Sequence, residues 1–193
     1  MRWDELFADI ESQLEHELDA EAQVLAAEEE RLRLARLGMR ERLLAMGRGA
    51  EPVTLVLADG ETLALRVGSA GRDWIAGEID LGRRRHLVVV PLASVSAALP
   101  GHGQLELGLA AQESDPVPDL AGRLGLAFVL RDLCRRRVGV ELSTRAGRVH
   151  GTLDRVGRDH LDLAEHEAGE PRRDRVVRRV RIVPFEAILR IRA

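Results

Sequence analysis

The chain has 193 residues and a hydrophobic fraction of 45%, which is enough for a buried core and excludes a disordered polypeptide. Its 29 basic residues are all arginine and its net charge is −3, so the charge balance argues neither for nor against a polyanionic partner. The single cysteine, Cys134, excludes an internal disulfide bond and a cysteine-based metal site. The sequence contains neither an apolar run of about 18 residues nor a signal-peptide region, so we expect a cytoplasmic protein without a membrane partner.

Residues 3 to about 47 are predicted to form one long helix, because they lack proline, contain no glycine before Gly38 and are rich in helix-forming residues. The net charge is −10 up to Glu30 and +5 over 31–48, which suits the helix dipole. A continuous helix of this length would measure roughly 65 Å. It therefore either breaks near Gly38 or projects and pairs with a second copy.

A thin, heptad-like apolar stripe runs along this helix. It predicts self-association, with a dimer as the favoured homo-oligomer. The alternative is a solvated helix that lays one apolar face on the rest of the protein. The residues expected to make the helical contact are Trp3, Phe7, Ile10, Leu14 and Leu18.

The next segment, residues 49–112, is expected to form a first small domain of five short strands. Apolar residues alternate with polar ones, as they do in half-buried strands, and Asp59-Gly60 marks a tight hairpin turn. Five strands in about 47 residues are typical of a small barrel. The expected strands are 53–57, 63–67, 74–79, 87–92 and 95–99.

The last segment, residues 113–193, is expected to form a helix and a second domain of the same kind. The connection that leads to it is rich in glycine, proline and aspartate, and it includes one candidate strand at Gln104–Leu109. Asp119 is a candidate cap for a helix that runs to about Arg136. Residues 1–48, the long N-terminal helix, are the third part of this division of the chain.

The two strand-rich segments match each other in sequence. Val53-Thr-Leu-Val-Leu aligns with Val138-Gly-Val-Glu-Leu, and Val90-Pro-Leu aligns with Val183-Pro-Phe. The second copy carries about seven extra residues, most naturally within 165–175. The pattern predicts an α+β protein, mainly β, with two tandem five-stranded small barrels, each preceded by a helix.

Three runs of the second copy follow a helix and contain glycines at the expected turns and bends: Gly147…Gly151-Thr-Leu, Gly157-Arg-Asp-His-Leu-Asp-Leu and Ile182-Val-Pro-Phe-Glu-Ala-Ile. Together they resemble the Sm-like (LSm/Hfq) fold, and the resemblance covers residues 50–99 and 119–193. The two barrels are therefore expected to be of Sm-like or SH3-like type. The resemblance also implies RNA-binding rings of six or seven barrels that are joined edge to edge through strands four and five.

The RNA-contacting residues of that family have no counterpart in this chain. The Tyr-Lys-His run that enters the last strand in Hfq is replaced by Arg181-Ile-Val-Pro or Val88-Val-Val-Pro. A frequent asparagine near strand three is Asp162, which repels phosphate. The proline in each Val-Pro pair removes a hydrogen-bond donor from the strand, so it is expected to limit edge pairing.

No segment carries a recognised catalytic motif, so we expect a non-enzymatic protein without a cofactor. His160 and Asp162 share one strand face by alternation and are conceivable metal ligands, although exposed polar side chains are the expected interpretation. Asp154, Asp159 and Asp162 could form an acidic catalytic group. For Asp154 and Asp159 the favoured interpretation is a role in turns.

Arginines near the C-terminus are the main functional candidates. Residues 171–193 hold eight arginines against two acids, a net charge of +6, and a hairpin would present several guanidinium groups to phosphate. A basic run lies at the equivalent place in the first copy. The alternative is a solvated hairpin whose arginines pair with acids. The expected polyanion-binding residues are Arg83, Arg84, Arg85, Arg172, Arg173, Arg175, Arg178 and Arg179.

These patterns lead to two functional hypotheses. The first is an Sm-like protein that binds RNA or another polyanion through its arginine-rich hairpins, with little base stacking because aromatic residues make up only 3% of the chain. The second is a structural or adaptor protein that binds other proteins and further copies of itself through the N-terminal helix and the barrel edges.

Overall fold

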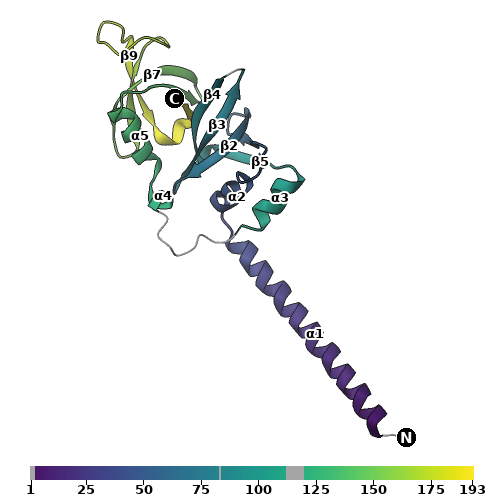
Figure 1. The fold of residues 1–193 in the computed structure, drawn as a ribbon. Helices are drawn as coiled ribbons and strands as arrows, with labels where there is room; N and C mark the ends of the chain where they lie inside the picture. Colours follow the sequence, from purple (N-terminus) through teal and green to yellow (C-terminus); the bar gives the residue numbers. More distant parts are fainter. Residues whose placement is uncertain (1–2, 83, 112–119) are drawn as a thin grey trace. The chain divides into compact units, whose positions relative to one another are not determined.

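A computed structural model describes residues 3–82, 84–111 and 120–193 of the chain (Figure 1). The chain divides after Leu37 into two compact units, and each is described by itself. The first unit consists of helix α1, Trp3–Arg36. The second unit, Gly38–Ala193, holds all the strands and the remaining helices.

The long N-terminal helix ends near Gly38, as one of the two sequence alternatives required. Gly38 has an extended backbone, with φ −76° and ψ 157°, and α2 begins after it at Met39–Met46. On α1, the side chain of Leu18 is exposed. The side chains of the other four residues expected to associate, Trp3, Phe7, Ile10 and Leu14, lie outside the described residues. Self-association through α1 therefore stays a prediction.

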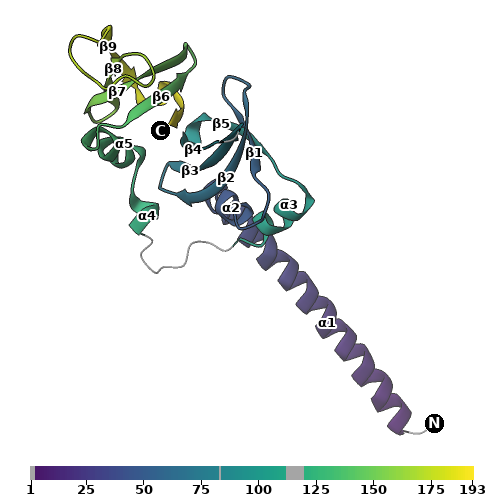
Figure 2. The same ribbon diagram turned by 45° about the horizontal axis from the view of Figure 1, so that its top comes forward.

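The second unit contains one antiparallel sheet of ten strands (Figure 2). The strands lie in the order β5-β1-β2-β3-β4-β10-β6-β7-β8-β9. The α+β class is confirmed, but the sheet is open and does not close into a barrel. The strands are β1 Val53–Leu57, β2 Thr62–Ala70, β3 Trp74–Leu81, β4 Arg84–Pro91, β5 Val95–Leu99, β6 Gly139–Thr144, β7 Gly147–Val156, β8 His160–Glu165, β9 Arg179–Pro184 and β10 Ile188–Arg192.

The strand order repeats the internal duplication. In each half the fifth strand is followed in the sheet by the first, second, third and fourth. A short 3-10 helix separates the fourth and fifth strands in both halves, as η1 Leu92–Ser94 and η2 Phe185–Ala187. The connection between the third and fourth strands is longer in the second half, where it spans 166–178. The expected extension therefore lies in this connection.

Each half encloses its own apolar core. The first core gathers residues of β1–β5 and the α2 residues Leu43 and Met46. The second gathers residues of β6–β10 and one face of helix α5, Leu126–Arg135. The cores also exchange residues, because Leu189 of β10 packs in the first core and Trp74 of β3 packs in the second. Apolar burial of this kind favours folding of the two halves together.

Two expectations about the connecting segment were wrong in detail. Gln104–Leu109 is not a strand but part of helix α3, His102–Leu109. The side chain of Gln104 accepts a hydrogen bond from the Gly101 N–H, 3.0 Å away, which caps the helix. The expected helix up to Arg136 is interrupted, because α4 covers only Leu120–Arg123 before α5 begins. Asp119, its expected cap, lies outside the described residues.

Candidate functional site: the sheet edges

The two halves meet where the fourth strand of the first half pairs with the fifth strand of the second. In this junction β4 and β10 run antiparallel, with Val89 opposite Ile191 and Val88 opposite Arg192. The pairing extends to the chain end, where the Ala193 N–H donates to the Leu87 carbonyl at 3.0 Å. The side chain of Val89 packs in the second core and is 4% exposed. The fourth strand therefore does not meet the fifth strand of its own half.

The pairing of β4 with β10 stops before the Val-Pro pair, so the expectation that this pair limits edge pairing stays a prediction. Pro91 ends β4, and the residues that pair with β10 are Val88 and Val89. The missing proline N–H thus falls outside the part of the strand that contacts the second half. Pro184 occupies the same position at the end of β9.

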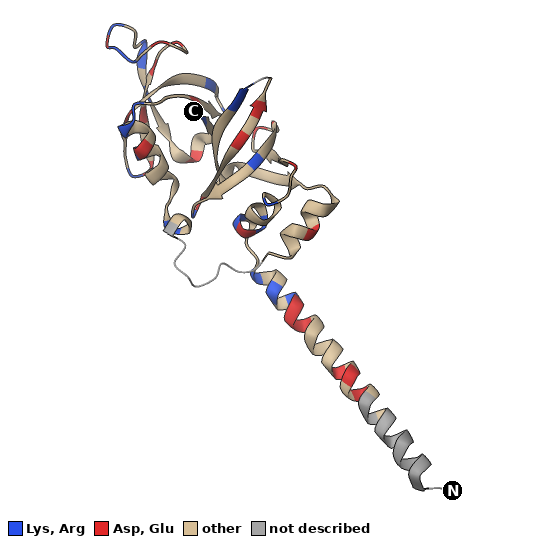
Figure 3. Ribbon diagram, viewed as in Figure 1, with Lys and Arg blue, Asp and Glu red and all other residues tan. Residues whose placement is uncertain are grey.

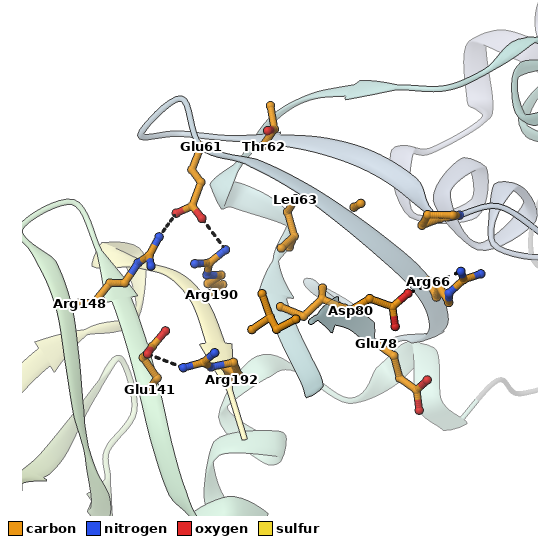
Figure 4. A pocket seen from close by; sticks show the side chains of 14 residues that line it. Glu61, Thr62, Leu63, Arg66, Glu78, Asp80, Glu141, Arg148, Arg190 and Arg192 are labelled. Carbon is orange, nitrogen blue, oxygen red and sulfur yellow. Dashed lines mark hydrogen bonds and ion pairs between the residues drawn. The ribbon is translucent and has the colours of Figure 1, made fainter. Parts of the chain in front are cut away.

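An ion cluster fastens the two halves beside the junction (Figure 4). Glu61, which follows the β1–β2 turn, accepts from Arg148 of β7 at 2.8 Å and from Arg190 of β10 at 2.9 Å. Arg190 is only 7% exposed, and its Nε also lies 3.2 Å from the Ser143 hydroxyl. The hydrogen bond to Glu61 raises the pKa of Arg148 above its ordinary value. A buried guanidinium needs such partners, so the cluster fixes how the halves join.

A polar cleft of about 310 Å³ opens over this cluster. Its walls carry as many positive as negative side chains, so the cleft has no surplus charge with which to attract an ion. The four arginines that line it are Arg66, Arg148, Arg190 and Arg192, and the four acids are Glu61, Glu78, Asp80 and Glu141. The cleft is therefore best explained as part of the junction between the halves.

Two edge strands have a neighbour on one side only. Among the described strands, β9 pairs with β8 alone and β5 pairs with β1 alone. The sequence repeat places Ile182 of β9 where β4 has Val89, and Ala98 of β5 where β10 has Ile191. Ile182 is 68% exposed, whereas Val89 is almost fully buried. An exposed apolar edge strand is a template for pairing with another chain.

Sequence patterns alone did not single out Ile182 as a site residue. The alternation of β9 places Val180 and Ile182 on one face, and both are exposed. The signal that could have found them was the repeat itself, because the equivalent position in the first copy is also apolar. What the sequence did not supply was the burial of that first position by the second half.

Most arginines of the second basic run pair with acids. Arg172 donates from Nε and Nη2 to the two carboxylate oxygens of Asp154, both at 2.8 Å, and from Nη1 to Asp174 at 2.7 Å. The hydrogen bonds with Arg172 lower the pKa of Asp154. Arg178 pairs with Glu167, and Arg179 with Glu165 at 3.2 Å. These pairs match the alternative of a solvated, internally neutralised hairpin.

The remaining arginines of the polyanion hypothesis are more open. Arg85 lies 3.4 Å from Glu78 and 3.5 Å from Asp80, and all three side chains are exposed. Arg84, Arg173 and Arg175 are exposed and have no acid partner among the described residues. Arg83 lies outside the described residues. Of the seven predicted residues that the structure describes, three thus keep an unpaired guanidinium group, one in the first half and two in the long connection of the second half.

The polar residues considered for chemistry are drawn into separate pairs. His160 Nδ1 lies 2.8 Å from Asp159, Asp162 lies 3.5 Å from Arg155, and Asp154 binds Arg172. Within the described part of the chain, no cluster of three or more histidine, cysteine, aspartate or glutamate side chains could hold a metal ion. No helix among the described residues is both long and apolar enough to cross a membrane.

A buried histidine anchors the long connection of the second half. His166 is buried, with Nε2 2.9 Å from the Thr152 hydroxyl and Nδ1 2.9 Å from the Glu167 carbonyl. The ring of His150 stands edge-on to it, with centroids 5.3 Å apart. Because both ring nitrogens of His166 face protein partners, this histidine holds the chain in place and has no free nitrogen for a ligand.

Comparisons with known proteins were made for the whole chain. A scan against models of protein families found no match, and a search of characterised proteins found none either.

Proposed function

We propose that the chain is a non-enzymatic assembly module made of two bent, Sm-like five-stranded units, and that copies join head to tail by pairing β9 of one with β5 of the next. The observation that carries this proposal is the contrast between two equivalent residues. Val89 is 4% exposed because it packs in the second core next to Ile191 of β10, and Ile182 is 68% exposed on a strand with no such neighbour.

The junction between β4 and β10 supplies the geometry of the proposed contact. Its register pairs Val89 with Ile191, so the equivalent contact pairs Ile182 of one copy with Ala98 of another. The next pair along is Arg181 with Leu99, whose side chain is exposed. Such a contact uses different surfaces on the two copies, so it propagates into a ring or an open chain of copies. A sheet edge that pairs with a strand of another copy can also pair with a strand of a different protein. In that case the chain acts as an adaptor.

Sedimentation velocity of the full chain over a hundredfold range of concentration, on the order of 1 to 100 µM, tests this proposal. We expect the average mass to rise with concentration, and Ile182→Asp to suppress the rise because a charge would be buried in the contact. Leu105→Asp is the matched control, since Leu105 is an exposed leucine that lies on α3 and on neither edge strand. An Ile182→Asp chain that assembles like the control, with both variants folded by circular dichroism, would rule out the edge contact.

Polyanion binding is a second candidate function, favoured by one observation. Arg84, Arg173 and Arg175 are exposed and have no acid partner among the described residues. We propose that RNA or another polyanion contacts its backbone phosphates through these side chains. Filter binding of a mixed-sequence RNA at two salt concentrations tests it, with a steep loss of affinity expected at the higher salt. Unchanged binding by the Arg173→Glu, Arg175→Glu double variant would exclude the hairpin as the binding surface.

A further inference from the structure

An apolar groove of about 390 Å³ lies beside the junction between the two halves. Trp74 and Val89 line it from the first half, and α4 and α5 line it from the other side. Two of its lining side chains are large, apolar and open to solvent: Phe128 of α5 is 54% exposed and Leu87 of β4 is 50% exposed. Its volume falls in the range of roughly 300–1,000 Å³ that is usual for binding sites. An apolar surface of this kind marks a place where another molecule binds.

The wall of the groove is basic. Residues 120–137, which form α4, α5 and the turn after it, hold five arginines against Asp132 alone, a net charge of +4. Arg136 lines the groove, and its Nε lies 2.7 Å from Asp132. The remaining positive charge favours an occupant that combines apolar side chains with negative charge.

Helix α1 has this combination of properties. Residues 13–30 contain seven acids and no arginine, so the segment carries a net charge of −7. Figure 3 shows acids of α1 as red bands. Leu18 and Leu25 are both exposed and lie seven residues apart, which places them on one face about 10 Å from each other. An amphipathic helix that lies in an apolar groove covers such leucines.

We propose that the groove lined by Phe128 and Leu87 binds helix α1 of a second copy of the chain, with Leu18 and Leu25 as the inserted side chains. The acidic side chains of 13–30 then face the arginines of 120–137. This contact is separate from pairing of the sheet edges, because neither β5 nor β9 contributes a residue to the groove.

Site-directed cross-linking in the full chain tests the contact. All variants carry Cys134→Ser, so that the introduced thiols are the only ones. A Leu25→Cys chain with one affinity tag is mixed with a Phe128→Cys chain that has another tag, and a short bis-maleimide is added. We expect at least about fivefold more mixed dimer than in either control mixture. One control replaces Leu25→Cys by Ala27→Cys, on the opposite face of α1, and the other replaces Phe128→Cys by Arg135→Cys, outside the groove lining.

Three outcomes would overturn the proposal. The first is equal mixed dimer in the controls. The second is an equal yield of dimer from the Leu25→Cys chain alone, which would mean that two α1 helices pair with each other. The third needs a further variant with both Leu25→Cys and Phe128→Cys: cross-linking that occurs only within such single chains would make the chain's own helix the occupant. The Ile182→Asp chain should keep the mixed cross-link, which separates failure here from failure of edge assembly.

Charge provides an independent check of the same contact. Arg136→Glu should reduce the yield of mixed dimer by about threefold or more. Added salt should also reduce this yield in the chains that keep Arg136. Arg145→Glu is the matched control, because Arg145 is an exposed arginine in the turn between β6 and β7. Equal yields from the two charge variants would contradict a role for the basic wall.

Discussion

Arg190 Nη1 lies 2.9 Å from Glu61 Oε1, so a residue of the last strand is held by the turn between the first two. The guanidinium is buried, and its other protein partner in this cluster is Ser143. Removing Glu61 would leave this charge without its counter-ion in the junction. Such a charge is costly because water reaches it poorly.

Glu61→Ala should therefore lower the free energy of unfolding by about 2 kcal/mol, the scale of a hydrogen bond to a charged group. Urea denaturation followed by circular dichroism measures the loss. Glu78→Ala is the control: its partner Arg85 is exposed and 3.4 Å away, so little change is expected. Equal losses for the two variants would show that the buried pair with Arg190 contributes no more than a surface pair.

The exchange of core residues predicts that the two halves unfold as one. Leu189 belongs to β10 but packs in the core of the first half, where it is 1% exposed. Leu189→Ala should cost about 3 kcal/mol, because it leaves a cavity among β-strand side chains. Differential scanning calorimetry should show one transition for residues 38–193 in both the wild type and the variant. Two resolved transitions, of which only one shifts to lower temperature in the Leu189→Ala variant, would contradict the coupling.

Much of the fold follows from local patterns in the sequence. The alternation in 53–57 and the turn at Asp59-Gly60 describe a hairpin that needs no distant contact, and β1 forms as expected. The repeat likewise predicts the same strand order in both halves. Local patterns failed at Gln104–Leu109, where every second residue is apolar as in a strand. The hydrogen bond that Gln104 accepts from the Gly101 N–H, and the packing of Gly108 against Met46, stabilise a helix here.

The candidate site could be predicted only in part, because it depends on which strands become neighbours. Ile182 is exposed and Val89 is buried, although both copies of the repeat have an apolar residue at this position. The sequence alone therefore cannot distinguish them. The difference arises only when β10 pairs with β4 instead of closing a barrel within one half. The pairing of Arg172 with Asp154 is also a contact between residues distant in the sequence, and it neutralises one of the charges on which the polyanion hypothesis relied.

A close approach of two strands makes Gly77 sensitive to substitution. A β-carbon at this position would lie 2.0 Å from the Arg66 carbonyl oxygen of the neighbouring strand. Because backbone atoms cannot move aside cheaply, Gly77→Ala should lower the free energy of unfolding by about 3 kcal/mol. Gly103→Ala in α3 is the control, with no atom within 4 Å of the new methyl group.

For the control, alanine should stabilise the helix by about 0.5–1 kcal/mol, so the two variants shift the urea midpoint in opposite directions. A Gly77→Ala chain as stable as the wild type would show that β2 and β3 can separate at this crossing without loss.

Asp154 predicts a specific dependence of stability on pH. Two hydrogen bonds from Arg172 hold the pKa of this carboxyl below its ordinary value of 3.8 in the folded chain. The ionised form is thus favoured by folding, and its stabilisation is present in full well above pH 3.8. As the pH falls through that value and then through the lower folded pKa, the unfolded chain takes up the proton first and the stabilisation is lost.

Asp154→Asn removes this ionisation while keeping the shape of the side chain. At pH 7 the variant should have a lower urea midpoint than the wild type, and the difference should shrink as the pH falls towards 3. Asp59→Asn is the control, because Asp59 sits in an exposed turn and an asparagine oxygen can still accept from the Glu61 N–H. A difference between Asp154→Asn and the wild type that stayed constant from pH 7 to pH 3, or grew towards acid, would exclude a pH-linked role for the bond with Arg172.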